Sequence, residues 1–274
     1  MHWKSLSPLK ASLSVLLVTL PFSVLAASER DEEVRPLEVA SSSDRPLRRP
    51  TVIQHPGKYM LRSDIHAEDT AIIIRASQVT LDLDGHFIWG PGGKKGVGIQ
   101  VDGVSNVAVR NGTIGRFGTA VGVVNARSVR IEQLQLTGED LGGTPPNIET
   151  GIMVIDSRGV FAQGNVIVDT FLGIFVRGGG SAGNRIAGNV ITGGQNGQLG
   201  ICYNPAPTGG SAGPRGDLVY NNSIARFRTG ISLSTESVAN IIRDNDIAYL
   251  MQAINEASPG TNVLLENASV QTFL

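Results

Sequence analysis

An aromatic ring, a guanidinium and a carboxamide stand at matched distances after glycines in the middle of this 274-residue chain. Phe175 and Arg177 lie two and four residues after Gly173, and Asn204 lies four residues after Gly200. A phenyl ring can stack on the face of a sugar ring, and an arginine can hold a carboxylate through two parallel hydrogen bonds. These residue types predict a surface that binds an acidic sugar chain.

The candidate binding set is an apolar platform with one cation, one amide and one loop acid. It comprises Met153, Phe175, Arg177, Asn204 and Asp140. As a catalytic set we consider Arg177, which would neutralise a substrate carboxylate, with Tyr203 or Glu149 transferring the proton. Structural roles stay open: Arg177 can pair with Asp156 or Glu149, and the apolar alternation places Tyr203 inward.

These residues meet only if a repeat of about 22 residues stacks them on one another. A small residue followed by an aliphatic one marks each copy: Gly98-Ile99, Gly122-Val123, Gly151-Ile152, Gly173-Ile174, Gly200-Ile201, Gly230-Ile231 and Ala253-Ile254. The copies contain short segments with period-2 alternation, which is typical of strands, and none contains a helical period. The pattern predicts a parallel β-solenoid of about eight or nine coils.

Stacking would turn equivalent residues into columns that run from coil to coil. Column members with amide side chains should hydrogen-bond to one another; they are Asn165, Asn189, Asn222 and Asn245. A second column predicts an acid–base–acid ladder of Asp84, Arg110 and Glu132. The inward residues Ile152, Ile174, Ile201 and Ile231 should lie directly above one another.

Segments 79–88 (VTLDLDGHFI) and 106–114 (NVAVRNGTI), with the repeated Gly-Asn-x-Ile, resemble a right-handed parallel β-helix protein. The resemblance is to the pectin-lyase-like superfamily, in its general β-helix-repeat branch, and it covers about residues 51–274. It implies an all-β, single-domain fold. It also implies lyases, hydrolases and epimerases of polysaccharides, phage tailspikes or copper-delivery accessory proteins, so it does not select one activity.

The motifs that would select an enzyme class are missing from the sequence. The Asn-Thr-Asp, Asp-Asp, Gly-His-Gly and Arg-Ile-Lys series of the polygalacturonase-type family does not occur. Among the outward columns Asp102 is a lone carboxylate, which argues against a calcium-dependent lyase. No cluster of His, Met and Cys predicts copper, and we expect no metal and no cofactor. If the protein is an enzyme, a metal-independent polysaccharide lyase or epimerase remains.

Residues 1–26 predict a secretory signal peptide, because Lys4 and Lys10 precede a short apolar segment that ends at Ala26. We expect residues 27–50 to be a disordered leader and residues 51–274 to be the β-helix domain. No other apolar run is long enough to span a membrane. With a net charge of −1 and no run of Lys or Arg, the sequence also argues against nucleic-acid binding.

Two hypotheses of function follow. The first is an exported protein, periplasmic or extracellular, that binds an acidic polysaccharide on one long face and, as an enzyme, cleaves or epimerises it. The alternative is a non-catalytic periplasmic or surface scaffold. Because no amphipathic helix follows the coil at 263–265, we also expect a homo-oligomer through the C-terminal coil.

Overall fold

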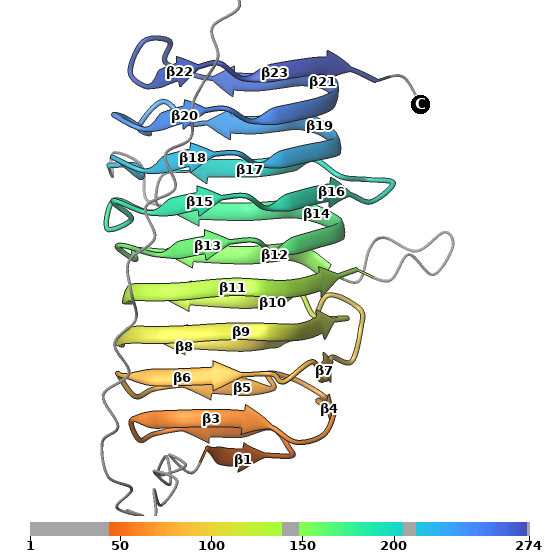
Figure 1. Ribbon diagram of the computed structural model, residues 1–274. Helices are drawn as coiled ribbons and strands as arrows, with labels where there is room; N and C mark the ends of the chain where they lie inside the picture. The colour runs from red at the N-terminus through yellow and green to blue at the C-terminus, as the bar shows by residue number, and fades with distance from the viewer. Residues whose placement is uncertain (1–43, 139–147, 205–211, 273–274) are drawn as a thin grey trace, which may run out of the picture. The chain divides into compact units, whose positions relative to one another are not determined.

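The computed structural model describes residues 44–138, 148–204 and 212–272, all within one compact unit that spans Ser41–Leu274. The expected signal peptide and residues 27–43 of the expected leader lie outside the described residues. The described residues contain strands and no helix, and the paired strands run parallel in successive coils (Figure 1). The predicted all-β parallel β-helix is therefore confirmed.

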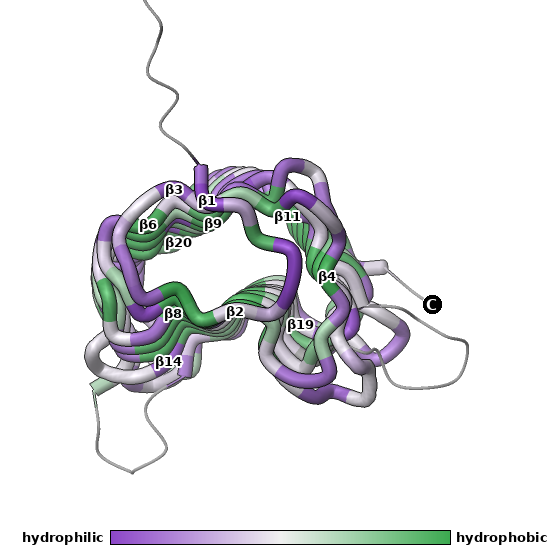
Figure 2. Tube along the Cα trace, turned by 90° about the horizontal axis from the view of Figure 1, so that it is seen from below, coloured by the Kyte–Doolittle hydropathy of each residue, from purple (hydrophilic) through white to green (hydrophobic). Residues whose placement is uncertain are grey.

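Each coil has three sides, which we call faces A, B and C, and β8, β6 and β4 lie on different sides in a view along the stack (Figure 2). Face A is formed by nine strands or parts of strands. They are β2 (Thr51–Ile53), β5 (Ile72–Ile74), β8 (Val97–Asp102), β10 (Thr119–Val124), β12 (Ile148–Ile155), the second half of β14 (Val166–Arg177), β17 (Leu199–Asn204), and the second halves of β19 (Ser223–Leu233) and β21 (Asp246–Glu256). This count agrees with the eight or nine coils expected.

Face B follows face A in each coil. It is formed by β1 (Arg45–Leu47), β3 (Gly57–Leu61), β6 (Val79–Asp82), the first halves of β9 (Ser105–Gly115) and β11 (Arg127–Thr137), β13 (Phe161–Gln163), β15 (Arg185–Ala187), β18 (Leu218–Tyr220), β20 (Ile241–Arg243) and β22 (Val263–Leu265). Because β1 pairs with β3, the described part of the stack already includes Arg45, six residues before the expected boundary at residue 51.

Face C closes each coil. It is formed by β4 (Ile65–His66), β7 (Phe87–Trp89), the second halves of β9 and β11, the first half of β14, β16 (Val190–Gly193), the first halves of β19 and β21, and β23 (Ala268–Gln271). Long strands such as β9 and β11 therefore turn a corner and contribute to both faces B and C.

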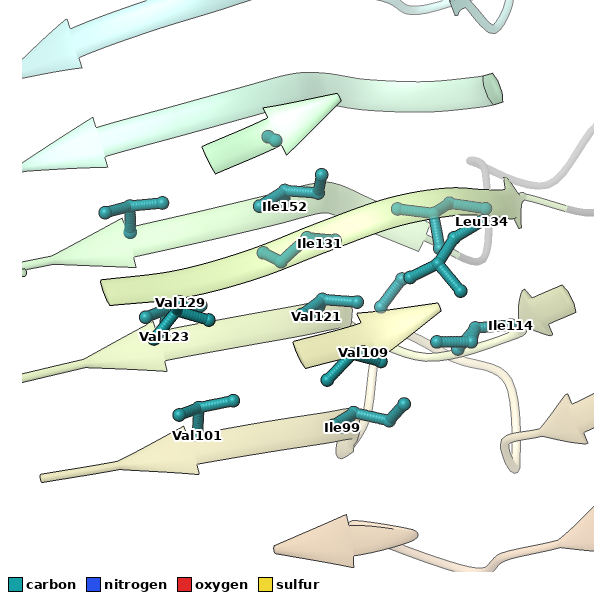
Figure 3. Packing of buried hydrophobic residues seen from close by; sticks show 14 of the residues in the cluster. Ile99, Val101, Val109, Ile114, Val121, Val123, Val129, Ile131, Leu134 and Ile152 are labelled. Carbon is teal, nitrogen blue, oxygen red and sulfur yellow. The ribbon is translucent and has the colours of Figure 1, made fainter. Parts of the chain in front are cut away.

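Aliphatic side chains from all three faces fill the interior of the coils, as Figure 3 shows for Ile99 of face A, Val109 of face B and Ile114 of face C. On face A one inward position is occupied by Thr51, Ile72, Ile99, Val121, Ile152, Ile174, Ile201, Ile231 and Ile254 in successive coils. The predicted alignment of the isoleucines is therefore confirmed. One of the predicted repeat pairs, Gly122-Val123, is wrong. The pair in register with Gly98-Ile99 is Ala120-Val121, two residues earlier.

Glycine precedes the inward isoleucine because the backbone there lies against the next coil. A Cβ atom at Gly173 would overlap the carbonyl oxygen of Gly200 and the side chain of Ile191. The glycine is therefore required by close packing. Left-handed glycines lie at the corners of the coils, for example Gly159 with φ 62° between faces A and B and Gly164 with φ 63° between faces B and C.

Amide ladders hold two corners of the coils together. At the corner between faces B and C, Asn165, Asn189, Asn222 and Asn245 each donate from Nδ2 to the Oδ1 of the next amide at 2.9–3.0 Å, which confirms the predicted column and extends it to Asn267. A second ladder at the corner between faces A and B contains Asn184, Asp217, Asn240 and Asn262. These buried bonds fix the register of the coils.

Candidate functional site

The outward side of face A brings the predicted binding residues together in the central coils. Met153, Phe175 and Cys202 are paired in register across β12, β14 and β17. The neighbouring outward position carries Ile155, Arg177 and Asn204 in the same three strands. We call these six positions the face A trough. Phe175 and Arg177 are half-buried, and Asn204 is exposed.

Arg177 has no ion pair among the described residues. Its expected partner Asp156 accepts the backbone N–H of Gly180 at 2.9 Å, and no ion pair joins Asp156 to Arg177. The backbone carbonyl of Arg177 accepts the Ser181 hydroxyl at 2.6 Å, which fixes the end of the strand. A half-buried guanidinium without an acidic partner in the described structure is able to receive a carboxylate from a ligand.

Tyr203 points into the interior and is fully buried. Its hydroxyl faces the buried Asp217, although no hydrogen bond of ordinary geometry joins the two. Burial, together with the Asp217 carboxylate, raises the pKa of Tyr203 well above its usual range. Tyr203 is therefore not placed to donate a proton on the outer side of face A, which corrects the role predicted for it. The strand alternation that places Phe175 outside places Tyr203 inside.

Cys202 occupies an outward position but is only 1% exposed. Burial raises the pKa of its thiol to about 12, so the group is a neutral thiol and a poor nucleophile at physiological pH. The two predicted loop acids are not described: Asp140 and the side chain of Glu149 lie outside the described residues.

A groove of about 570 Å³ lies on face B, away from the predicted trough. It is lined by Val79, Thr80, Asn106, Val107, Ala108, Ser128, Arg130, Gly159, Val160, Phe161, Gly183 and Arg185. No residue that we predicted for a site lies among these. The sequence contains a signal for it only in hindsight, since Arg130, Phe161 and Arg185 share one outward register position.

Metal ligands do not gather among the described residues. No three His, Cys, Asp or Glu side chains of this part of the chain lie close enough to hold an ion. His86 is hydrogen-bonded to Asp64, with 3.1 Å between Nδ1 and Oδ1. Nor does any helix in the described ranges have the length and apolar character needed to cross a bilayer.

Solved structures with the same fold include DFA-IIIase from Arthrobacter chlorophenolicus A6. Its form without the lid, in complex with GF2, is 14% identical with a TM-score of 0.56, over 81% of this chain and 62% of that one. The C387A mutant in complex with DFA-III is also 14% identical, with a TM-score of 0.55, over 80% of this chain and 58% of that one. An exopolygalacturonase from Thermotoga maritima is 10% identical, with a TM-score of 0.49 over 76% of this chain and 54% of that one.

This chain therefore spans about three fifths of the length of the DFA-IIIase structures, and the likeness shows a shared fold. It confirms the parallel β-helix fold that the sequence predicts. No curated protein matches the chain. One family model does, over residues 70–269, and its description is "Periplasmic copper-binding protein (NosD)".

Proposed function

Since this chain belongs to the NosD family, we propose that it is an exported β-helix protein that binds an acidic polysaccharide in the face A trough. The family description names the periplasm, which agrees with the signal peptide expected at residues 1–26. The observation that carries the proposal is the juxtaposition of Phe175 with Arg177, whose guanidinium has no acidic partner among the described residues. The aromatic ring offers a stacking surface and the guanidinium offers paired donors to a uronate.

Copper does not enter this proposal, because the described residues do not fit it. Copper binds through a thiolate or a thioether, but the two sulfur atoms of the trough lie two coils apart, in Met153 and in the buried Cys202. His55 and His66 belong to the first coils and His86 bonds to Asp64, so no imidazole lies in the trough. We therefore derive no copper chemistry from this part of the chain.

Turnover depends on a proton-transfer group that faces the trough. Tyr203 does not meet this requirement, because its hydroxyl lies inside the coil. Arg177 remains as the described member of the predicted catalytic set on the outer side. Binding is the proposed activity, and lyase or epimerase action is its enzymatic extension.

The test is the affinity of the full chain for galacturonate oligosaccharides, measured by isothermal titration calorimetry. We expect Arg177→Gln to weaken binding about tenfold, because a charge-assisted hydrogen bond to a carboxylate is lost. Arg226→Gln is the matched control, since Arg226 is exposed and lies outside the trough, and it should change affinity less than twofold. Unsaturated product by ultraviolet absorbance, and reducing ends, report turnover in the same samples. A wild-type chain that binds no glycan would favour the scaffold alternative.

A second part of the proposal concerns the last coil. Large apolar side chains are exposed there, with Met251 70%, Val270 59% and Leu265 49% exposed. Within the described residues, β22 pairs with β20 and β23 pairs with β21, which leaves the outer edges of both strands unpaired. We propose that a second copy of the chain covers this coil. Light scattering should give the mass of a dimer for the wild type and of a monomer for Leu265→Lys, with circular dichroism confirming that the variant folds.

A further inference from the structure

Two arginines and a phenylalanine form one outward column along the groove on face B. Arg130, Phe161 and Arg185 occupy the same register position in three successive coils. The guanidinium of Arg130 lies 5.9 Å from the centre of the Phe161 ring, and its Nε is 3.5 Å from an oxygen of Glu132. Arg185 is exposed and has no ion pair within the described ranges. The groove therefore presents cationic donors on both sides of an aromatic ring.

A second column of arginines borders this groove at the corner between faces A and B. Parallel backbone β-bridges pair Arg127 with Arg158, Arg158 with Ala182, and Ala182 with Arg215. The three arginines therefore share one column. Arg127 and Arg158 directly precede Ser128 and Gly159, which line the groove. All three arginines are exposed, and none has an ion pair in the part of the chain that the structure describes.

The rim between the two columns is bare. Gly159 and Gly183 line the groove with φ of 62° and 64°, a conformation that favours glycine. No heavy atom lies within 4 Å of the position that a Cβ would take at Gly183. A chain-like ligand in the groove therefore has direct access to the backbone of this corner.

The balance of charge in this region is strongly positive. Five exposed arginines lie within it, namely Arg127, Arg130, Arg158, Arg185 and Arg215. The described carboxylates nearby are Glu132, which already contacts Arg130, Asp156, which accepts the Gly180 N–H, and the buried Asp217, which accepts hydrogen bonds from Asn184. The sequence contains no run of basic residues, so this basic stripe is created by the register of the coils.

The spacing of the cations indicates the ligand. Neighbouring coils lie about 4.8 Å apart, so Arg130 and Arg185 are separated by two coils, or roughly 10 Å. In the corner column Arg127 and Arg158 lie in adjacent coils, and Arg158 and Arg215 are two coils apart. A sugar unit of an extended polysaccharide is about as long as one coil is high. The two cations of the face B column, Arg130 and Arg185, therefore match anionic groups on alternate sugars, with the Phe161 ring against the sugar between them.

We propose that the face B groove binds a polysaccharide that carries a carboxylate or sulfate on alternate sugars. This site is separate from the face A trough and does not depend on it. A single-stranded nucleic acid fits less well, because sites for it stack successive bases on several aromatic rings. Phe161 is the one aromatic residue among those that line this groove. Binding should fall steeply with salt, because exposed charges are screened at high ionic strength.

The experiment measures binding of a fluorescent hyaluronan oligosaccharide, which has one carboxylate on every second sugar, to the full chain by anisotropy. We expect Arg130→Gln/Arg185→Gln to weaken binding at least tenfold at low salt. The control Arg226→Gln/Arg228→Gln removes the same charge from exposed positions outside the groove and should change affinity less than twofold. Equal melting temperatures would show that both variants are folded.

Three results would overturn the proposal. An equal loss in both double variants would mean diffuse attraction to net charge and no specific site. Undiminished binding by Arg130→Gln/Arg185→Gln would place the ligand elsewhere. A single-stranded oligonucleotide that binds as tightly, through the same arginines, would identify the site as one for nucleic acid. A failure of the trough proposal would be seen separately, as unchanged galacturonate binding in Arg177→Gln.

Discussion

Faces A and B are built from the same coils, yet their outer surfaces differ in charge. Face A presents Phe175 beside Arg177, one half-buried cation among mostly apolar outward side chains. Face B presents Arg130 and Arg185 along a groove, with further arginines at its corner. Their inner sides are alike, since both are lined by aliphatic side chains that pack from coil to coil.

This difference shows that stacking restricts which side chains can occupy the inward positions of the coils and leaves the choice of outward side chains free. Inward side chains contact two neighbouring coils and cannot change size without a cavity or a clash. Outward side chains contact mostly solvent and one another. Stability should therefore depend on inward and corner residues, while ligand binding should depend on outward ones.

The largest expected effect comes from breaking a corner ladder. Asn222 is 1% exposed; its Oδ1 accepts the N–H of Asn189 at 3.0 Å, and its Nδ2 donates to the Ile186 carbonyl at 2.9 Å. Asn222→Ala would leave several buried groups without partners, at a cost of about 3–5 kcal/mol in the free energy of unfolding. Urea unfolding measures this loss. The exposed Asn196→Ala is the matched control and should cost less than about 0.5 kcal/mol.

The next effect sharpens the comparison, because Asp217 stands inside the corner between faces A and B. Burial raises the pKa of Asp217 from 3.8 to about 6. The folded state therefore holds a proton that the unfolded state releases between these values. Stability should fall by about 3 kcal/mol as pH rises through this range and stay low above it.

Asp217→Asn should flatten this pH dependence and raise stability at neutral pH, because an amide at this position can donate to the next ladder member, Asn240, and carries no charge. Thermal unfolding between pH 4 and pH 8 measures the change. Asp246→Asn, at an exposed carboxylate, is the control and should keep the wild-type profile. Matching profiles for Asp217→Asn and the wild type would contradict the assignment of the pH dependence to this carboxyl group.

The smallest effect should come from an outward ion pair. Arg110 Nε lies 2.9 Å from an oxygen of Asp82, which occupies the same position of face B in the adjacent coil. Half of the Arg110 side chain is exposed. Arg110→Gln should cost about 0.5 kcal/mol, because solvent and salt screen such pairs. Chemical denaturation measures it. A loss above about 2 kcal/mol would break the comparison, since it would show that outward pairs also hold the coils together.

Several columns could be predicted because their members repeat with the period of the coil. The isoleucines from Ile152 to Ile231 and the asparagines from Asn165 to Asn245 fall in the predicted order. The acid–base column was partly wrong, since Arg110 and Glu132 align with Asp82 and not with Asp84. Asp84 lies past the end of β6 with a φ of 49°, where the chain already turns and counting by twos no longer applies.

The sequence by itself determined the architecture of this protein: short alternating segments at a regular interval, with aliphatic residues on the inner side, can bury their apolar surface only by stacking. It also placed Phe175 and Arg177 together, because they belong to one strand. Only the tertiary structure decided that Arg130, Phe161 and Arg185 share a groove and that the Tyr203 hydroxyl faces Asp217. The physical reason is that loops of different length separate the coils. Hydrogen bonding between coils, and not distance along the chain, sets which outward residues become neighbours.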